Sequence, residues 1–218
     1  MALALFDLDN TLLADDSDYL WGEFLVEQGL VDGDWYAREN ARFYEDYRQG
    51  RLDIDAFLRF SLRPLAEHPT ERLLALRDQF LREKILPVIP PAARRLLARH
   101  AAAGDTRVIV TATNAFVTRP IADALGVEHL IATEPECIDG RYTGRVQGIP
   151  CFREGKVRRL EAWLAETGHT LEGSWFYSDS HNDLPLLERV DRPVAVDPDD
   201  RLRAVAAERG WPVISLRE

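Results

Sequence analysis

From residue 90 onward, short segments rich in β-branched and aromatic residues alternate with segments whose apolar residues have helical spacing. Together with an apolar run at 3–6, the expected strands are 106–110, 129–132, 174–177 and 193–196. The expected helices are 90–100, 119–125, 155–167, 183–189 and 200–209. This alternation predicts an α/β fold, a Rossmann-like parallel sheet with helices on both faces.

One long segment, residues 15–85, interrupts this pattern because it looks wholly helical. It holds eleven of the chain's 20 aromatic residues, so we expect it to have a small core of its own. Since it lies between the first two strands in sequence, we expect a lid above the carboxyl edge of the sheet. The predicted domains are therefore a core, 1–14 with 86–218, and an inserted all-helical cap, 15–85.

The sequence Asp7-Leu8-Asp9-Asn10-Thr11 follows directly after the first apolar run. In an extended segment, Asp7 and Asp9 lie on the same side, two residues apart. They also lie at a strand's carboxyl end, where open α/β sheets bind ligands. Two such carboxylates can hold a divalent cation, or one can attack a substrate while the other moves protons. The alternative is a strand end followed by a helix cap.

Thr111 ends the second core strand and is followed by turn residues and a helix. Its hydroxyl and nearby backbone N–H groups, such as that of Ala112, can point at one phosphate. Lys156 begins a helix, where a cation opposes the helix dipole, so a role as a fixed charge near a phosphate is one explanation. Alternatively, Thr111 is an ordinary strand residue and Lys156 a solvated surface residue.

A second acidic loop, Ser178-Asp179-Ser180-His181-Asn182-Asp183, follows the aromatic strand at 174–177. Asp179 there fits a Mg²⁺ ligand. Asp183 fits the same role, although it could instead cap the next helix. Because Mg²⁺ prefers oxygen, we interpret His181 as a loop residue rather than a ligand.

Composition narrows the choice of partners and compartment. The net charge of -10 argues against a nucleic-acid surface, and no apolar stretch approaches the length of a membrane span. The start of the chain has no basic leader, and neither Cys137 nor Cys151 has metal-ligand spacing. We therefore expect a cytoplasmic protein with two free thiols, a monomer or a homodimer.

The order of these motifs resembles the haloacid dehalogenase superfamily, in particular its phosphoserine-phosphatase-like branch (subfamily IB), whose lid is a helical insert. The resemblance covers nearly the whole chain, including 139–144 before the lysine and 194–198 after the acidic loop. Two motifs differ from the sequences common in that branch: Ser178-Asp179-Ser180 replaces Gly-Asp-Gly, and Ala112-Thr113-Asn114 replaces a Gly-Gly pair. Similar motif sequences occur in histidinol-phosphate phosphatases.

This resemblance implies a role for each matching residue. Asp7 would attack phosphorus and form an aspartyl-phosphate, and Asp9 would act as general acid and then as general base. The implied Mg²⁺ site consists of Asp7, Asp9 through its backbone carbonyl, Asp179 and Asp183. The implied phosphate site consists of Thr111, Ala112 and Lys156. Asp16 and Asn182 are the expected substrate contacts, although Asp16 equally suits a helix start.

The sequence thus predicts a Mg²⁺-dependent phosphomonoester hydrolase acting on a small phosphorylated metabolite. Histidinol phosphate or phosphoserine is the expected substrate type. Two alternatives stay open. One is a phosphotransferase or mutase acting on a sugar phosphate, and the other is a non-enzymatic protein that binds a phosphorylated metabolite on the same fold.

Overall fold

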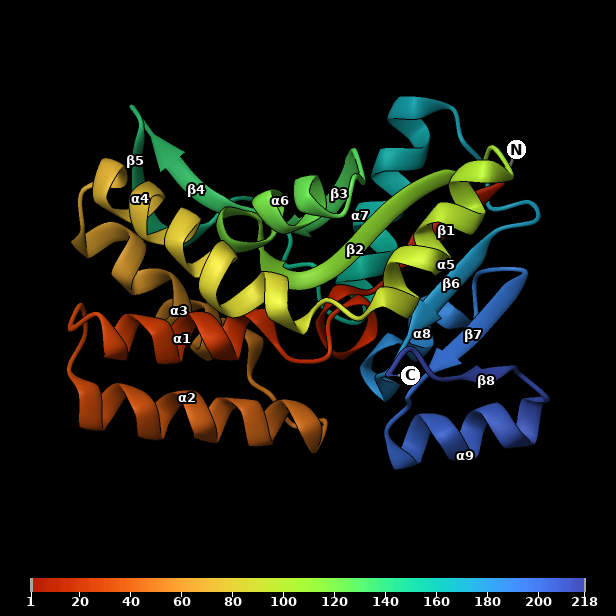
Figure 1. The fold of residues 1–218 in the computed structure, drawn as a ribbon, viewed down its shortest axis with the longest axis horizontal. Coiled ribbons are helices and arrows are strands. Elements are labelled where there is room, and N and C mark those ends of the chain that lie inside the picture. Colours follow the sequence, from red (N-terminus) through yellow and green to blue (C-terminus); the bar gives the residue numbers. More distant parts are fainter. Residues whose placement is uncertain (1, 218) are drawn as a thin grey trace.

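A six-stranded parallel sheet forms the centre of the protein in the computed structural model, which describes residues 2–217 (Figure 1). The strand order is β3-β2-β1-β6-β7-β8. The strands are β1 (Leu3–Phe6), β2 (Thr106–Asn114), β3 (His129–Thr133), β6 (Trp175–Ser178), β7 (Arg192–Val196) and β8 (Val213–Ile214). Because β1 lies between β2 and β6, the three strands whose ends carry the sequence motifs are neighbours.

Helices cover both faces of the sheet, as the alternating pattern predicts. They are α5 (Pro91–Ala102), α6 (Ala115–Ala124), α7 (Glu154–Thr167), α8 (Leu184–Leu187) and α9 (Asp200–Arg209). Successive side chains of a strand point to opposite faces. Accordingly Phe6 packs in one apolar cluster with residues of α5 and α6, while Leu5 packs in the other with residues of α7, α8 and α9.

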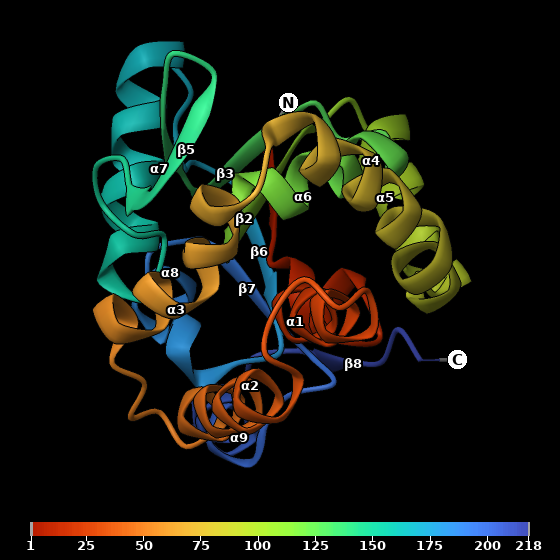
Figure 2. The same cartoon turned by 90° about the vertical axis from the view of Figure 1, so that its left-hand side faces the viewer.

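A block of four helices lies beyond the carboxyl ends of the strands (Figures 1 and 2). The helices are α1 (Ser17–Glu27), α2 (Gly33–Arg48), α3 (Ile54–Glu67) and α4 (Thr70–Phe80). Asp16, Asp32 and Asp53 begin the first three by accepting backbone N–H bonds at their N-termini. As the sequence predicts, residues 15–85 contain no strand within the described chain.

The apolar interior of this helical block is continuous with one face of the sheet, so the expectation of a separate small core is wrong. The junction is aromatic: the ring of Trp21 lies 5.1 Å from that of Phe80 and 5.8 Å from that of Phe116 in α6. An antiparallel hairpin, β4 (Pro135–Ile138) and β5 (Arg141–Val146), also packs on the block. Thr70 donates a hydrogen bond to the carbonyl of Gly140 at its turn.

Pro64 lies buried inside α3 and does not end it, since the helix runs on to Glu67. One expectation for the core was wrong. The second core strand runs beyond Thr111 to Asn114, because an irregular register between Val110 and Asn114 lets β2 continue pairing with β3.

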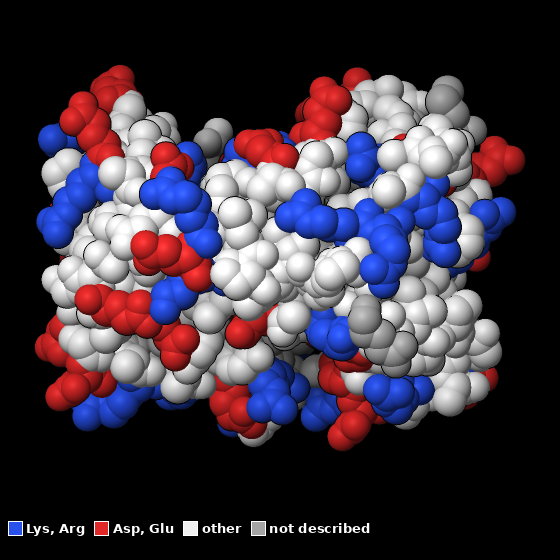
Figure 3. Space-filling model, viewed as in Figure 1, with Lys and Arg blue, Asp and Glu red and all other residues white. Residues whose placement is uncertain are grey.

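The surface and the cysteines agree with the composition. Acidic and basic side chains are interspersed on the face seen in Figure 3. Cys137 is exposed and Cys151 is buried, and they form no disulfide. Between residues 2 and 217, no helix has both the length and the apolar character needed to cross a bilayer.

Candidate active site

The motif residues meet at the carboxyl edge of the sheet, on the side of the helical block. Asp7 extends β1, and its backbone N–H bonds the carbonyl of Tyr177 in β6. The chain then makes a wide turn closed by the N–H of Leu13 on the carbonyl of Leu8. Asn10 allows this turn because it adopts φ 56°, a left-handed conformation that Asn tolerates better than most residues. The turn brings Asp9 back over the strand ends.

Lys156 joins two of the motif carboxylates. Its Nζ lies 2.7 Å from Oδ1 of Asp7 and 2.8 Å from the carboxylate of Asp183. Ser178 donates a further hydrogen bond of 2.7 Å to Asp183. The side chains of Lys156, Asp7 and Asp183 are at most 5% exposed, so this is a buried cluster and not a surface ion pair.

Gly155 makes this position of Lys156 feasible. A Cβ at residue 155 would lie 2.0 Å from the carbonyl oxygen of Pro150, so only glycine permits this approach at the start of α7. The preceding Arg153 takes φ 49° as the helix begins. Lys156 is therefore buried against carboxylates, whose negative charge offsets the unfavourable interaction between its cation and the helix dipole.

Burial shifts the proton affinities of this cluster. Desolvation raises the pKa of Asp7 to about 7, against the lowering effect of Lys156, while the charges of Asp183 and Asp9 raise it further. Desolvation also holds the pKa of Asp179 well above its ordinary value, with added repulsion from Asp7 and Asp183. Desolvation lowers the pKa of Lys156, but Asp183 and Asp7 outweigh it and raise the pKa overall. The cluster thus carries excess negative charge.

Asp9 is fixed by hydrogen bonds from two different elements. Its Oδ1 accepts the backbone N–H of Ser17 at 2.7 Å, at the first turn of α1. Its Oδ2 accepts the hydroxyl of Thr113 at 2.7 Å and that of Thr111 at 3.4 Å. These bonds hold the carboxyl beside Thr111, and they depend on the extension of β2 beyond that residue.

Thr11, the last residue of the D-x-D-x-T motif, connects Asp7 to the acidic loop after β6. Its hydroxyl lies 3.4 Å from Oδ2 of Asp7 and 3.1 Å from Oδ1 of Asp179. It also accepts the backbone N–H of Asp179 at 3.1 Å. Two carboxylates that face one hydroxyl in this way are close enough to share a small cation.

The donors at this point suit Mg²⁺. Asp7, Asp179 and Asp183 offer only oxygen, and their charge exceeds what the single ammonium of Lys156 can offset. Within residues 2–217 no three His, Cys, Asp or Glu side chains form a ready-made metal cage. Mg²⁺ does not require one, since it usually keeps several waters and binds through one or two carboxylates and substrate phosphate. The residues therefore fit the ion.

Three side chains from outside the helical block bind carbonyl oxygens where α2 ends. Arg153 donates to the carbonyl of Gly50 at 2.6 Å, and Asn182 donates to that of Tyr47 at 3.2 Å. Arg201 donates to that of Gln49 at 3.1 Å. Together they tie the helical block to the strand-end loops.

The remaining loop residues have structural partners. The amide of Asn182 also bonds Arg153, and Asn182 does not line the cavity described below. His181 bonds Asp199 at 2.7 Å through Nδ1. The alternative in which Asp183 caps the next helix is wrong, because its side chain makes no capping hydrogen bond to α8.

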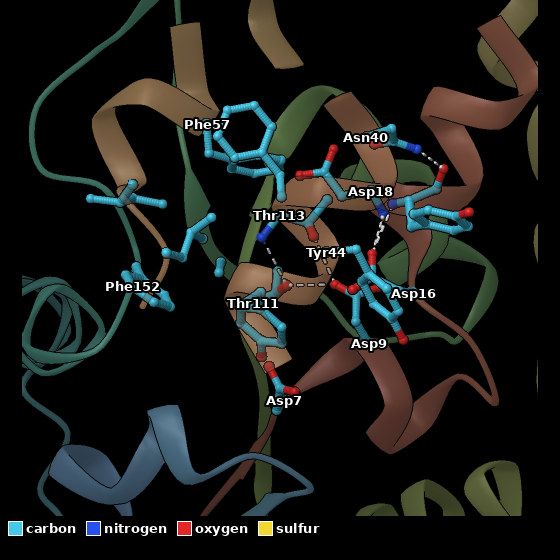
Figure 4. Close-up of a pocket in the computed structure, with 16 residues that line it drawn as sticks. Asp7, Asp9, Asp16, Asp18, Asn40, Tyr44, Phe57, Thr111, Thr113 and Phe152 are labelled. Atoms are coloured by element: carbon cyan, nitrogen blue, oxygen red, sulfur yellow. Dashed lines mark hydrogen bonds between the residues drawn. The ribbon is translucent and has the colours of Figure 1, made fainter. Parts of the chain in front are cut away.

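A cavity of about 50 Å³ lies between the strand ends and the helical block (Figure 4). Asp7, Asp9, Thr111 and Ala112 line it from the core. In the view of Figure 4, Asp7 lies at one end, and Asp18, Asn40 and Phe57 lie at the other. Asp16 lines it too, while its Oδ1 accepts the N–H groups of Asp18 and Tyr19. Asp16 is thus both a helix cap and a cavity residue.

Sequence reasoning missed four residues around these groups. Thr113, Ser178 and Thr11 hold Asp9, Asp183 and Asp179 by the hydrogen bonds given above. Asp18 lines the cavity. Only their position in the sequence could have pointed to these residues, since all four lie within or directly beside the motifs. Nothing in their residue types separates them from turn and cap residues.

Comparisons with known proteins identify the family and agree with the fold. The family model "haloacid dehalogenase-like hydrolase" matches residues 4–188. A histidinol-phosphatase of Neisseria meningitidis serogroup C is 47% identical over 219 residues, which cover 99% of both chains. The phosphoserine phosphatase SerB1 of Mycobacterium tuberculosis is 33% identical over 221 residues, 99% of this chain and 71% of that protein.

A solved structure is similar over almost the whole chain. It belongs to a protein of unknown function from Bordetella pertussis Tohama I and is 50% identical. The similarity has a TM-score of 0.93 and covers 99% of this chain and 98% of that one.

Proposed function

The chain belongs to the haloacid dehalogenase-like hydrolase family and is a phosphomonoester hydrolase, and from this premise we propose that Asp7 is its nucleophile. The observation that carries the proposal is the 2.7 Å contact between Lys156 Nζ and Oδ1 of Asp7. This contact fixes the carboxylate at the wall of the cavity. The cavity gives a substrate access to it, since Asp7 lines that space.

In the first half-reaction, a carboxylate oxygen of Asp7 attacks phosphorus and the bond from phosphorus to the ester oxygen breaks. Asp9 gives its proton to the departing oxygen, so the product leaves as an alcohol. The hydrogen bonds from Ser17 and Thr113 orient Asp9 for this transfer. Lys156 and the hydroxyl of Thr111, with the backbone N–H of Ala112, hold the phosphoryl oxygens.

In the second half-reaction, Asp9 takes a proton from water, and the water oxygen attacks the phosphorus of the aspartyl-phosphate. The bond from phosphorus to the Asp7 oxygen breaks, inorganic phosphate leaves, and the Asp7 carboxylate is restored. Asp9 is again protonated and ready for another ester. Splitting hydrolysis in this way replaces one difficult step with two easier ones.

We assign the metal site to the carboxylates of Asp7 and Asp179, with the backbone carbonyl of Asp9 and with Asp183 nearby. Phosphatases of this family are generally Mg²⁺-dependent. When bound, the ion would offset the negative charge of the phosphoryl group and of the buried carboxylates. The oxygen-only donors and the excess negative charge described above support this assignment.

Residues 15–85 form the cap of this site. The cavity is partly covered by this block, because Asp18, Tyr44 and Phe57 line it opposite Asp7 and Asp9. We expect the helical block to move outward as substrate enters and to exclude bulk water on its return. The bonds from Arg153, Asn182 and Arg201 to the end of α2 are the contacts that such opening would break.

For the substrate, we propose a small amino-acid-related phosphate of the histidinol phosphate or phosphoserine type. The similarity to a histidinol-phosphatase and to a phosphoserine phosphatase supports this class. The cavity supports it too, since its acidic side chains provide partners for an amino group.

The test is release of inorganic phosphate from p-nitrophenyl phosphate and from both amino-acid-related esters, with Mg²⁺ and with chelator. We expect Mg²⁺-dependent release that Asp7→Asn reduces at least about 10,000-fold, because the nucleophile is lost. Asp139→Asn, in the exposed hairpin turn, is the matched control and should behave like the unaltered enzyme. Comparable turnover by Asp7→Asn would refute the covalent mechanism. Transfer of phosphate to an added sugar, in place of release, would favour the phosphotransferase alternative.

A further inference from the structure

The cavity has two chemically different ends. Its phosphate end lies at the carboxyl ends of the strands and includes Asp7, Asp9 and Thr111. Its far end belongs to the helical block and contains two acidic side chains, Asp16 and Asp18. The far end would surround the part of the substrate that leaves as an alcohol, so its chemistry determines which alcohol fits.

Neither acid at the far end has a cationic partner. Among residues 2–217, no Lys, Arg or His lies within ion-pair distance of Asp16 or Asp18. None of the described residues that line the cavity is basic. By contrast, Lys156 at the phosphate end faces Asp7 from below the cavity. The far end therefore offers negative charge and no site for a carboxylate.

The side walls of the cavity are aromatic, with edges or faces from Phe43, Tyr44, Tyr47, Phe57 and Phe152. Aromatic faces attract cations through the ring quadrupole, and they also accept a flat ring by stacking. Asn40, which is only 6% exposed, lines the same end and adds a polar contact. Its amide is held in place by donating to the carbonyl of Tyr19 at 3.0 Å.

We propose that Asp18, together with Asp16, selects a leaving group that carries a protonated amine and no carboxylate, so that the preferred substrate is the phosphate ester of an amino alcohol. The proposal rests on the phosphatase function proposed above and narrows its substrate class. A carboxylate-bearing ester such as phosphoserine would place its negative charge beside two acids without a basic partner. Such an unpaired charge is strongly disfavoured in a water-poor cavity.

The proton affinities at the far end agree with this assignment. Desolvation, followed by the charge of Asp9, raises the pKa of Asp18 to about 7. Desolvation and Asp9 also raise the pKa of Asp16 well above its ordinary value, although backbone N–H groups of Tyr19 and Asp18 oppose the rise. A positively charged group in the cavity would offset both effects, and the protein itself supplies none there.

The first test uses two esters of nearly equal size that differ in their end group, phosphoethanolamine with an ammonium and phosphoglycolate with a carboxylate. Histidinol phosphate and phosphoserine form a second pair, and p-nitrophenyl phosphate serves as a substrate without either group. With the full chain and Mg²⁺, we expect kcat/KM to favour the amine-bearing member of each pair by at least about 100-fold. A preference for phosphoglycolate or phosphoserine would overturn the inference.

The second test is Asp18→Asn, which keeps the shape of the side chain and removes its charge. We expect kcat/KM for histidinol phosphate to fall about 30-fold relative to p-nitrophenyl phosphate, mainly through KM, as when one partner of a buried charge pair is lost. Asp34→Asn, at an exposed position in α2, is the matched control and should leave that ratio unchanged.

The outcomes separate the two proposals. If p-nitrophenyl phosphate is hydrolysed but Asp18→Asn leaves the ratio of the two substrates unchanged, the inference fails and the phosphatase function stands. If none of the esters is hydrolysed, both proposals fail. A lower ratio that comes from kcat alone would also contradict the inference, because it would make Asp18 a positioning residue for the chemistry.

Discussion

The two ends of the cavity differ in whether their acidic side chains have a cationic partner within the protein. At the phosphate end, Asp7 and Asp183 share the ammonium of Lys156, and Ser178 donates to Asp183. At the far end, Asp16 and Asp18 have backbone donors at most and no ion pair among the described residues. The first is held by the buried ends of strands, and the second by helices of the cap.

This difference agrees with the proposed roles, in which the strand ends carry the chemistry and the helical block recognises the leaving group. Groups that must meet a phosphorus atom within a fraction of an ångström benefit from a rigid sheet and from partners that lock them. Groups that recognise the leaving alcohol are better left without partners, because the substrate then supplies the missing charge. Such unsatisfied groups reduce stability, a common cost of functional sites.

The largest expected effect comes from removing the cation that the phosphate end shares. Lys156→Met should lower the free energy of unfolding by about 3 to 5 kcal/mol without divalent ions, because it leaves Asp7 and Asp183 buried without a counter-charge. Phosphate release should fall about 100- to 1,000-fold. Urea denaturation and steady-state kinetics measure the two effects.

A second lysine gives the control for this variant. Lys84→Met removes a partly exposed pair with Glu27 and should cost at most about 1 kcal/mol. Equal losses for Lys84→Met and Lys156→Met would remove the distinction between a buried, shared cation and an ordinary surface pair.

An intermediate effect is expected at Thr113, which positions Asp9. Thr113→Val keeps the shape of the side chain but removes the hydroxyl that donates to Oδ2 of Asp9 at 2.7 Å. We expect kcat to fall about 100-fold with little change in KM, because the carboxyl loses its fixed orientation. Thr113→Ser should restore most of the activity. If the serine variant is as slow as the valine variant, the hydroxyl is not what matters.

The smallest effect concerns how the free energy of unfolding changes with pH. Ionisation of Asp18 should lower it, whereas ionisation of Asp105 should raise it. Burial and then Asp9 raise the pKa of Asp18 in the folded protein to about 7, from an ordinary value of 3.8. Ionised Asp18 therefore lowers the free energy of unfolding. This loss is complete above pH 7 and absent well below pH 3.8, where Asp18 is protonated in both states. Asp18→Asn should thus stabilise the protein by about 0.5 to 2 kcal/mol at pH 8, and the gain should vanish at low pH.

Asp105, at the opposite edge of the sheet, is the matched case. Burial raises its pKa, but hydrogen bonds from His100 and from the backbone N–H of Ala2 outweigh this and lower it overall. Ionised Asp105 therefore stabilises the fold above 3.8, and the contribution is lost as pH falls through the lowered value. Asp105→Asn should be destabilised at neutral pH and approach the unaltered protein in acid. Thermal melts from pH 3 to 8 measure how each variant changes the melting temperature. If the two variants change it in the same direction at neutral pH, the assignment is wrong.

Much of the sheet and its surrounding helices was predictable because periodicity is local. The apolar runs and their turn residues gave the parallel sheet and the order of its helices. The ends of β1 and β6 placed Asp7 and Asp179 at one edge. The helical nature of residues 15–85 followed from the same pattern.

Other features depended on packing that no local pattern contains. Pro64 continues a helix because its surroundings are buried, and the interior of the helical block merges with the sheet through Trp21 and Phe116. The sequence did not show which residues hydrogen-bond the Asp9 carboxylate. Thr113 is close enough to do so only because β2 continues past Thr111.

The order of strands, helices and acidic loops was determined by the sequence alone, because side-chain spacing and turn residues act between near neighbours in the chain. The tertiary structure decided which of those groups become partners. Lys156 reaches Asp7 across 149 residues, and Asp18 faces the cavity from a helix that the sequence predicted only as part of the helical segment 15–85. Both arrangements depend on how the cap and α7 pack on the sheet, and contacts between distant residues are set by that packing rather than by local preference.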